Sequence, residues 1–343
     1  MSLMAEEIAQ IPAVLRTQFQ HHAPLLKTLA AQIHHFNPAF IVTIARGSSD
    51  HAATFARYLF ETQLGLITAS AAPSVYTLYK TPMHLKKALV IALSQSGASP
   101  DLCETLAAAR QQGALTVALV NQVDSPLAKI AEWVIPLYAG PEHAVAATKS
   151  YVATLHALVQ LSLALQSNAA LQAALQQLPL HIAQSSPTLC EHLLSAYAKA
   201  QTTLITARGF GFPIALELAL KFKEVTQIHA ESFSSAEILH GPFSLFNQAF
   251  PVLVLTQNDA TLPAVHTLIQ QMHQTAVQPI LVGDQTTLSP FPDLPQLCLP
   301  ITHPILTPLL SVAALYPCIE ALARSKGLNP DAPPLIQKIT RTL

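Results

Sequence analysis

The sequence predicts an α/β protein made of two tandem, doubly wound parallel sheets of the flavodoxin-like type. An internal duplication is indicated by three landmarks at one spacing. The first, Ala45-Arg46-Gly47, recurs 162 residues later (207 − 45) as Ala207-Arg208-Gly209. The strand-like run ending at Ser94 recurs at the same distance (256 − 94) as the run ending at Thr256, and Val117–Val120 lies opposite Pro279–Val282. In each half, short β runs alternate with longer alanine- and leucine-rich helical stretches, which is typical of a parallel sheet covered by helices.

The chain divides into four parts. Residues 1–38 are expected to form leading helices that end before Pro38, because the residue preceding a proline disfavours helical backbone. The first lobe is expected over 39–165 and the second over 188–327, joined by a polar linker from Gln166 to Pro187. Both lobes have the length of an ordinary domain.

The last part, 328–343, is a proline-rich tail. Its apolar side chains, Leu335, Ile336 and Ile339, are expected to dock on the body of the protein and to carry Lys338 with them. A C-terminus without such anchors would be poorly ordered.

Composition limits the classes of partner. Charged residues make up 11% of the chain and hydrophobic residues 51%, whereas a typical domain has about 25% charged residues. We therefore expect part of the surface to be covered by a second copy of the chain, in a homodimer. The net charge of −1 provides no basic field for nucleic acid. The longest apolar helical stretch, Tyr151 to Leu165, is too short and too polar for a membrane span.

Cysteine and histidine patterns predict no metal centre and no cofactor. The four cysteines show no CxxC spacing, which suits free thiols in a reducing cytoplasm. The pairs His21-His22 and His34-His35 are adjacent in sequence and point to different helix faces, so they do not form a ligand set. The acidic start with Glu6 is not a secretion signal. A cytoplasmic location is therefore expected.

A candidate anion site follows the third strand-like run. The segment Ser94-Gln95-Ser96-Gly97-Ala98-Ser99 comes directly after the apolar residues 88–93 and leads into a predicted helix at Pro100. Backbone N–H groups, the helix dipole and hydroxyl side chains can surround a phosphate there. An ordinary turn with Ser99 as the N-cap explains the same residues, and the turn alone does not distinguish an anion site from an ordinary helix start. Ser48 and Ser49 offer hydroxyls at a neighbouring strand end.

The second half carries a group of ionisable residues on one predicted helix face. Glu217, Lys221 and Glu224 are spaced i, i+4 and i+7, which is also the pattern of a surface ion-pair ladder. His240 closes a short predicted helix, Ser234–His240, ended by Gly241-Pro242, where a cation is favourable without any catalytic role. Arg46 and Arg208 occupy equivalent places, so internal pairing is the expected role of Arg46.

Taken together, these motifs resemble the tandem sugar isomerase (SIS) domain family, and most closely the isomerase half of the glucosamine-6-phosphate synthases. The resemblance runs from about Phe40 to Leu343. The segments that carry it are Ser94-Gln-Ser-Gly97, Val145-Ala-Ala-Thr-Lys149, Pro213-Ile-Ala-Leu-Glu217, Leu220-Lys-Phe-Lys-Glu224, Ile228-His-Ala-Glu231 and His240-Gly-Pro242.

The resemblance implies a site for a sugar 6-phosphate that needs no cofactor. It implies that the phosphate is held by a set of polar side chains: Ser48, Ser49, Ser94, Gln95, Ser96 and Ser99. Val145 and Gly47 would line the sugar site, and Glu224 would move a proton between carbon 1 and carbon 2. Lys221 would stabilise the negative intermediate, and Lys338 would close over the ring. His240 would come from the neighbouring subunit and help to open the ring.

Departures from the synthase pattern favour a different reaction. The first turn reads Arg46-Gly47-Ser48-Ser49 instead of a cysteine, glycine, threonine, serine pattern, Ala98 replaces an acidic residue, and Ala147 replaces a serine. Fewer than forty residues precede the first lobe, too few for a glutaminase domain. The expected activity is therefore that of a glucosamine-6-phosphate deaminase, which yields fructose 6-phosphate and ammonia.

Two alternatives remain at this point. A deglycase of amino-acid adducts of sugar 6-phosphates could use the room left by Ala98 and Ala147. A non-catalytic sugar-phosphate sensor is the second alternative, although a sensor has no need for Glu224, His240 and Lys338 together.

Overall fold

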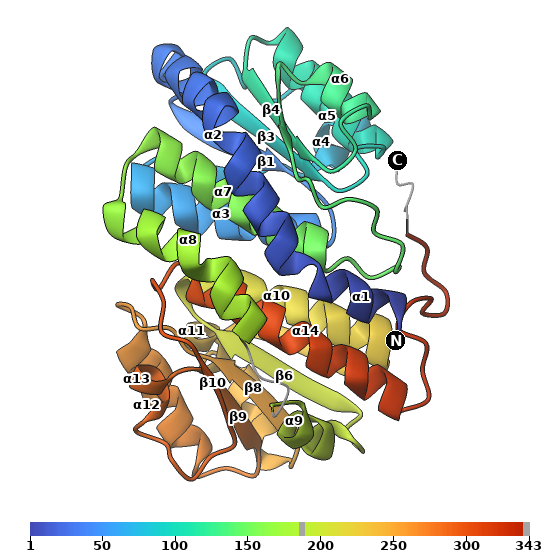
Figure 1. Ribbon diagram of the computed structural model, residues 1–343, viewed down its shortest axis with the longest axis vertical. Helices are drawn as coiled ribbons and strands as arrows, with labels where there is room; N and C mark the ends of the chain where they lie inside the picture. Colours follow the sequence, from blue (N-terminus) through green and yellow to red (C-terminus); the bar gives the residue numbers. More distant parts are fainter. Residues whose placement is uncertain (185–188, 339–343) are drawn as a thin grey trace. The chain divides into compact units, whose positions relative to one another are not determined.

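The computed structural model describes residues 1–184 and 189–338, which form two compact units (Figure 1). Of the described residues, the β1–β5 unit comprises Ala13–Glu142, Lys149–Gln172 and residues 337–338. The β6–β10 unit comprises Met1–Pro12, His143–Thr148 and Ala173–Ile336.

A five-stranded parallel sheet forms the centre of the β1–β5 unit. Its strands lie in the order β2-β1-β3-β4-β5, with all neighbours parallel. Phe40 lies opposite Ala88, and Leu89 lies opposite Leu115. The strands are β1 (Phe40–Ile44), β2 (Thr68–Ser70), β3 (Ala88–Ser94), β4 (Leu115–Val120) and β5 (Trp133–Pro136). This order is the flavodoxin-like one that the sequence predicts.

Helices cover both faces of this sheet (Figure 1). On one face, Val42 and Val90 pack against Leu106 of α5 and Leu127 of α6. On the other face, α3 and α7 pack against each other, and α3 contacts the strands. These helices are α3 (Ser48–Leu64), α5 (Pro100–Gln111), α6 (Pro126–Ile130) and α7 (Lys149–Leu165), with α2 (Ile11–Phe36) beside α7 and the short α4 (Pro73–Thr77) against α5.

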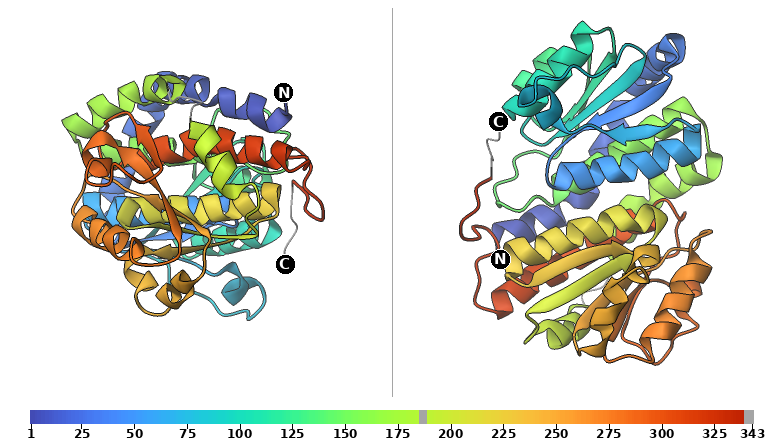
Figure 2. Two further views of the ribbon diagram at one scale, coloured as in Figure 1. Left: turned by 90° about the horizontal axis from the view of Figure 1, so that it is seen from below. Right: turned by 180° about the vertical axis from the view of Figure 1, so that it is seen from behind.

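The β6–β10 unit repeats the same strand order from the opposite edge, β10-β9-β8-β6-β7 (Figure 2). Its strands are β6 (Thr202–Ala207), β7 (His229–Ser234), β8 (Pro251–Leu255), β9 (Gln278–Asp284) and β10 (Gln296–Leu299). The three sequence landmarks fall on or directly after β1, β3 and β4 in one unit and β6, β8 and β9 in the other. The predicted duplication and the fold class are confirmed.

Two sets of helices pack on the second sheet. Residues of α12 (Leu262–Met272), α11 (Ser235–Ile238) and α13 (Gln285–Leu288) form a core with β8 and β9. Helix α10 (Phe212–Lys221) contacts β6 and β7, and α14 (Thr307–Ser325) contacts α10 and β9. Three further helices complete the unit: α1 (Leu3–Ala9) and α9 (Leu189–Tyr197), both against α14, and most of α8 (Ala169–Gln184).

The interpretation of residues 166–187 as a polar linker is wrong for most of that range, because Ala169–Gln184 is the helix α8. Leu171, Leu175 and Leu178 follow the i, i+4, i+7 pattern, and all three are buried. The abundant glutamines of the segment hide this apolar stripe. Residues 185–187 lie outside the described part of the chain.

The predicted helix at 234–240 is shorter than expected. Helix α11 ends at Ile238, and Pro242 opens a 3₁₀ turn, η3 (Pro242–Asn247), instead of stopping helical structure. Proline suits the first position of such a turn because that position needs no intrahelical N–H donor.

Among the described residues, the C-terminal tail is held by polar contacts and not, as expected from the sequence, by the side chains of Leu335 and Ile336. Leu335 is fully exposed and Ile336 is exposed, so this expectation is wrong for both, while Ile339 lies outside the described residues. Asp331 instead accepts hydrogen bonds from the backbone N–H groups of Leu3 (2.9 Å) and Met4 (2.8 Å). A carboxylate at a helix N-terminus satisfies donors that have no partner within the helix.

No helix in residues 1–184 or 189–338 has the length and the apolar character needed to cross a membrane.

A buried polar cluster lies between α2 and α7. The Nδ1 atom of His156 is 2.6 Å from Gln18 Oε1 and 2.8 Å from Gln160 Nε2. Among the described residues, the Nε2 atom of His156 and the Nδ1 atom of His22 have no hydrogen-bond partner. Burial, and to a smaller extent the neighbouring His22, lower the pKa of His156 to about 3. The native state therefore holds a neutral imidazole that an unfolded chain would protonate.

This cluster predicts a loss of stability in acid. Because the folded pKa of His156 lies below 6.5, the stabilisation is complete above pH 6.5 and is lost as the pH falls towards 3. Each pH unit in this window should lower the free energy of unfolding by up to about 1.4 kcal/mol. Urea unfolding at pH 7 and pH 5 measures this slope. His156→Gln should flatten the slope, and the exposed His34→Gln should not. Equal slopes in all three proteins would contradict the assignment.

Candidate active site

Two strand-to-helix junctions lie side by side in the β1–β5 unit. Strands β1 and β3 are hydrogen-bonded neighbours, so their carboxyl ends meet at one edge of the sheet. Ser48 and Ser49 open α3 directly after β1, and residues 95–99 connect β3 to α5. Ligands of open parallel sheets bind where such neighbouring strands are followed by helices on opposite faces. The N-terminal N–H groups of both helices are donors suited to an anion.

The loop after β3 is shaped by its own hydroxyl groups. The Ser94 hydroxyl accepts a hydrogen bond from the Gly97 N–H (3.0 Å), and the Ser96 hydroxyl accepts one from the Ala98 N–H (3.3 Å). Gln95, Ser96 and Ser99 remain partly exposed. The loop is therefore fixed in a compact turn while hydroxyl and amide groups stay accessible to a ligand.

Gly97 is required by this turn. Its φ of 62° is in the left-handed region, and a Cβ atom built on it would lie 2.1 Å from Ser125 Oγ and 2.6 Å from Ser125 Cβ. Ser125 cannot simply rotate away, because its Cβ also clashes and its hydroxyl caps α6 by accepting from the Ala128 N–H. Only glycine meets both demands.

An ion pair ties the two junctions together. The Arg46 guanidinium lies 2.9 Å (Nη2) and 3.0 Å (Nε) from the Oδ2 atom of the buried Asp101, at the start of α5. This confirms the expected internal pairing of Arg46. The arrangement cannot repeat in the other unit, because the position equivalent to Asp101 is Pro263.

In the β6–β10 unit, the charged residues predicted on one helix face form a buried network. The Lys221 ammonium lies 3.5 Å from Glu217 Oε1 and makes an ion pair with Glu224, while Tyr316 donates a hydrogen bond to Glu217 (3.1 Å). The side chains of Lys221 and Glu217 are buried. A surface ladder is therefore excluded for these two residues.

The network keeps Lys221 charged. Burial alone would lower the pKa of Lys221, but the carboxylates of Glu217 and Glu224 outweigh burial and raise this pKa above its ordinary value. Glu224 lies in η2 (Phe222–Thr226), a π-helical turn that extends α10, and its side chain is 21% exposed. Single π-helical turns are frequent at functional sites. The geometry thus presents a partly accessible carboxylate next to a permanent cation.

His240 follows α11 and is exposed. Its backbone N–H donates to the carbonyl of Glu237 (3.0 Å), which ends the helix. Two large apolar side chains near it, Leu239 and Leu245, are 53% and 46% exposed. The His240 imidazole therefore stands on an accessible, partly apolar surface.

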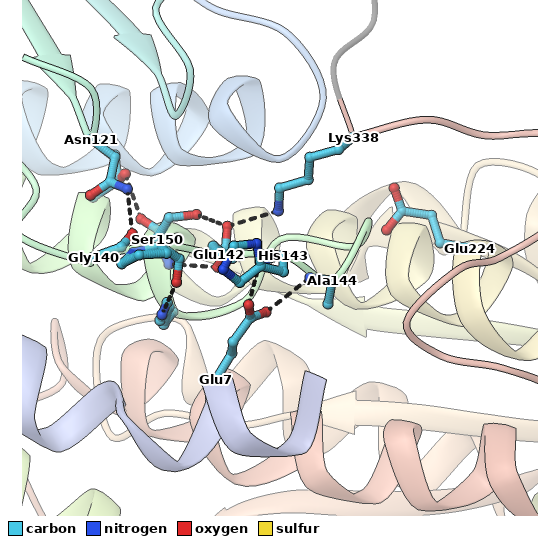
Figure 3. Close-up of polar contacts among 12 residues, drawn as sticks. Glu7, Asn121, Gly140, Glu142, His143, Ala144, Ser150, Glu224 and Lys338 are labelled. Carbon is cyan, nitrogen blue, oxygen red and sulfur yellow. Dashed lines mark hydrogen bonds and ion pairs between the residues drawn. The ribbon is translucent and has the colours of Figure 1, made fainter. Parts of the chain in front are cut away.

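Sequence reasoning missed Glu142. Figure 3 shows this carboxylate between Ser150 and Lys338, and the Lys338 ammonium lies 3.1 Å from its Oε2 atom. No local pattern marks Glu142, since Lys338 is 196 positions away. The predicted sugar-site residue Val145 belongs to the other unit, where its N–H donates to the carbonyl of Asp331 (3.0 Å). The predicted site residues thus divide between the two units.

Within the described ranges, no group of three or more histidine, cysteine, aspartate or glutamate side chains is arranged to hold a metal ion.

Comparison with a protein-family model shows two matches to the SIS domain, over residues 37–164 and 196–312. Among curated relatives, a glutamine–fructose-6-phosphate aminotransferase (isomerizing) of Symbiobacterium thermophilum is 33% identical over 307 residues, which cover 85% of this chain and 50% of that protein. The relative from Zymomonas mobilis, with the same name, is 29% identical over 96% of this chain and 57% of its own length. The chain thus spans about half the length of these curated relatives.

Solved structures agree. A candidate phosphosugar isomerase of Silicibacter pomeroyi DSS-3 is 34% identical, with a TM-score of 0.86 over 96% of this chain and 100% of that one. A glucosamine-6-phosphate deaminase of Thermotoga maritima has a TM-score of 0.81 over 99% of this chain and 100% of that one, at 18% identity. The second likeness shows a common fold and nothing finer.

The contacts of Gly97 predict that Gly97→Ala is costly. The left-handed φ and the overlap with Ser125 should together lower the free energy of unfolding by about 3 kcal/mol. Gly113 is the matched control, because its φ is 83° and nothing lies within 4 Å of a Cβ built on it. Gly113→Ala should cost only about 1 kcal/mol. Urea unfolding of both variants checks the difference, and equal losses would show that the Ser125 overlap is relieved without cost.

Proposed function

The chain belongs to the SIS domain family, and we propose that it converts glucosamine 6-phosphate and water into fructose 6-phosphate and ammonia. The observation that carries the proposal is the partly exposed Glu224 carboxylate held against the buried Lys221 ammonium. A general base and a cation that stabilises a developing oxyanion are the two groups that aldose–ketose isomerisation requires. The similarity to a candidate phosphosugar isomerase over nearly the whole chain supports this class of reaction.

The proposed direction of the reaction uses only groups that lie within the matched region. The chain covers about half of each curated relative, so the complete activity in their name does not transfer to it. Release of ammonia requires only the sugar phosphate, water and a group that moves a proton. It is the simplest reaction consistent with the residues described.

The proposed steps use the residues as follows. The phosphate binds at the β1 and β3 junctions, where Ser48, Ser49 and residues 94–99 provide hydroxyls and helix N-termini provide N–H donors. His240 assists opening of the sugar ring. Glu224 then removes the proton from carbon 2 and returns it to carbon 1, which turns the amino aldose into a ketose imine. Water adds to carbon 2 of the imine, and ammonia leaves.

We also propose a cytoplasmic homodimer in which His240 serves the active site of the neighbouring subunit. The low charge content of 11% and the exposed Leu239 and Leu245 beside His240 support a covered surface there. Free cysteines suit a reducing compartment.

One observation favours a second candidate, a deglycase of amino-acid adducts of sugar 6-phosphates. Ala98 is exposed at the phosphate loop, and Ala147 is partly exposed in the segment that carries Val145. Short side chains at both positions leave room for a substituent on nitrogen. The proton would move between the same two carbons in the opposite direction, from carbon 1 to carbon 2. Water would then add to carbon 1 of the resulting aldose imine, and an amino acid would leave in place of ammonia.

Glu224→Gln should abolish turnover, because an amide cannot accept the proton. Loss of a general base lowers kcat by roughly 10²- to 10⁴-fold. The assay measures ammonia and fructose 6-phosphate formed from glucosamine 6-phosphate without glutamine. Glu191→Gln, an exposed change in the same unit, is the control and should retain activity. Full activity in Glu224→Gln would refute its role as the base. If the wild-type protein binds glucosamine 6-phosphate without forming products, amino-acid adducts of sugar 6-phosphates are the next substrates to assay. If these adducts are not converted either, the function as a non-catalytic sugar-phosphate sensor is favoured.

Mixing two inactive variants tests the shared site. If Glu224 and His240 of different subunits form one site, co-refolded Glu224→Gln and His240→Asn chains contain one intact site in each mixed dimer. About a quarter of the wild-type activity should return, since half of the dimers are mixed and each has one of its two sites intact. If the two residues of one chain serve the same site, mixing restores nothing.

A further inference from the structure

The Glu142 carboxylate is built into the β1–β5 unit with several fixed partners. Its Oε1 atom accepts a hydrogen bond from the Ser150 N–H (3.1 Å), and its Oε2 atom accepts one from the Ser150 hydroxyl (2.6 Å). The Glu142 side chain is fully buried. A buried carboxylate is expensive unless it is hydrogen-bonded and paired with a cation. Ser150 provides the bonds, and the Lys338 ammonium at 3.1 Å provides a positive charge (Figure 3).

The segment before Glu142 is anchored to the same edge of the sheet as residues 95–99, the loop between β3 and α5. Asn121 directly follows β4, and its side chain donates to the carbonyl of Gly140 (2.8 Å) and accepts from the Ala139 N–H (2.9 Å). The Lys149 ammonium donates to the carbonyl of Pro141. Glu142 is therefore oriented by β4 on one side and by the first turn of α7 on the other.

In the described part of the tail, which ends at Lys338, the large apolar side chains next to Lys338 do not anchor the chain. Leu335 and Ile336, the two large apolar residues before Lys338, are exposed. The Lys338 side chain is 23% exposed, so the ammonium is largely withdrawn from solvent at Glu142. The ion pair between Lys338 and Glu142 can therefore determine the position of Lys338.

We propose that Glu142 is a positioning residue that binds Lys338 and fixes this lysine at the carboxyl edge of the β1–β5 sheet. An ammonium has three N–H donors, so Lys338 can bind Glu142 and a sugar oxygen at the same time. In the proposed function, on which this role for Lys338 rests, a lysine held in one place loses less entropy when it meets the substrate. The charge of Glu142, and not merely its shape, is the essential property.

The first test needs no substrate. Glu142→Gln keeps the size of the side chain and an acceptor for Ser150 but removes the charge. We expect acetylation of Lys338 by a water-soluble anhydride, followed by peptide mass spectrometry on the full chain, to become at least about fivefold faster relative to the exposed Lys27. The control is Glu132→Gln. Glu132 likewise accepts from a backbone N–H (3.1 Å) and a hydroxyl (3.2 Å), both of Thr116, so Lys338 should be labelled there at the wild-type rate.

An unchanged labelling rate in Glu142→Gln, with the variant folded by circular dichroism, would overturn the proposal. Failure of the proposed reaction would not affect this result. The two hypotheses can therefore be separated.

The second test is a double-mutant cycle on turnover. Glu142→Gln should lower kcat/KM at least about tenfold. If Glu142 acts through Lys338, the double variant Glu142→Gln, Lys338→Met should be no worse than Lys338→Met alone. Losses that multiply would show that Glu142 acts independently of Lys338 and would overturn the positioning role. If Glu142 had a purely structural effect, the losses in kcat/KM of the two single variants would also multiply. The cycle therefore distinguishes a structural effect from the positioning role.

Discussion

Two hydrogen-bonded parallel strands, β1 and β3, end side by side, and a short loop joins each of them to a helix. This constraint sets the rest of the β1–β5 unit. It brings the N-termini of α3 and α5 to one edge, forces Gly97 into a left-handed turn against Ser125, and makes the Arg46–Asp101 ion pair possible. Asn121 directly follows the next strand, β4, and holds the segment before Glu142 at that edge. Glu142 in turn binds Lys338.

The β6–β10 unit has the same topology, but the polar groups at the equivalent strand ends have different partners. Thr256 and Gln257 stand where the first unit has Ser94 and Gln95. The Thr256 hydroxyl bonds Val282 and Thr287, and the Gln257 amide donates to the carbonyl of Arg208. These polar groups are occupied by the protein itself. The duplicated edge therefore offers fewer groups to a ligand, and the charged residues of the proposed site in this unit lie on α10 and η2.

The sequence allowed the strand ends, the start of α5 at Pro100 and the pairing of Arg46 to be predicted, because each depends on local pattern or on the repeat. It could not reveal contacts between distant segments. Leu335 and Ile336 look like anchors of the tail by composition, whereas Asp331 at the start of α1 and Lys338 on Glu142 hold it. The prediction of a polar linker failed for a related reason. Three buried leucines, and not the average polarity of the glutamine-rich segment, determine that it forms the helix α8.

The Lys221 network suggests how a base and an electrostatic stabiliser can share one ion pair. A single ammonium faces two carboxylates, and Glu217, which also accepts from Tyr316, is the buried one. Glu224 is the partly exposed one, and it lies in the π-helical turn. In the proposed reaction, Glu224 becomes neutral when it takes the proton from carbon 2, so its attraction for Lys221 weakens. At that moment the sugar oxygen gains negative charge, and the same ammonium can stabilise it without any movement of the backbone.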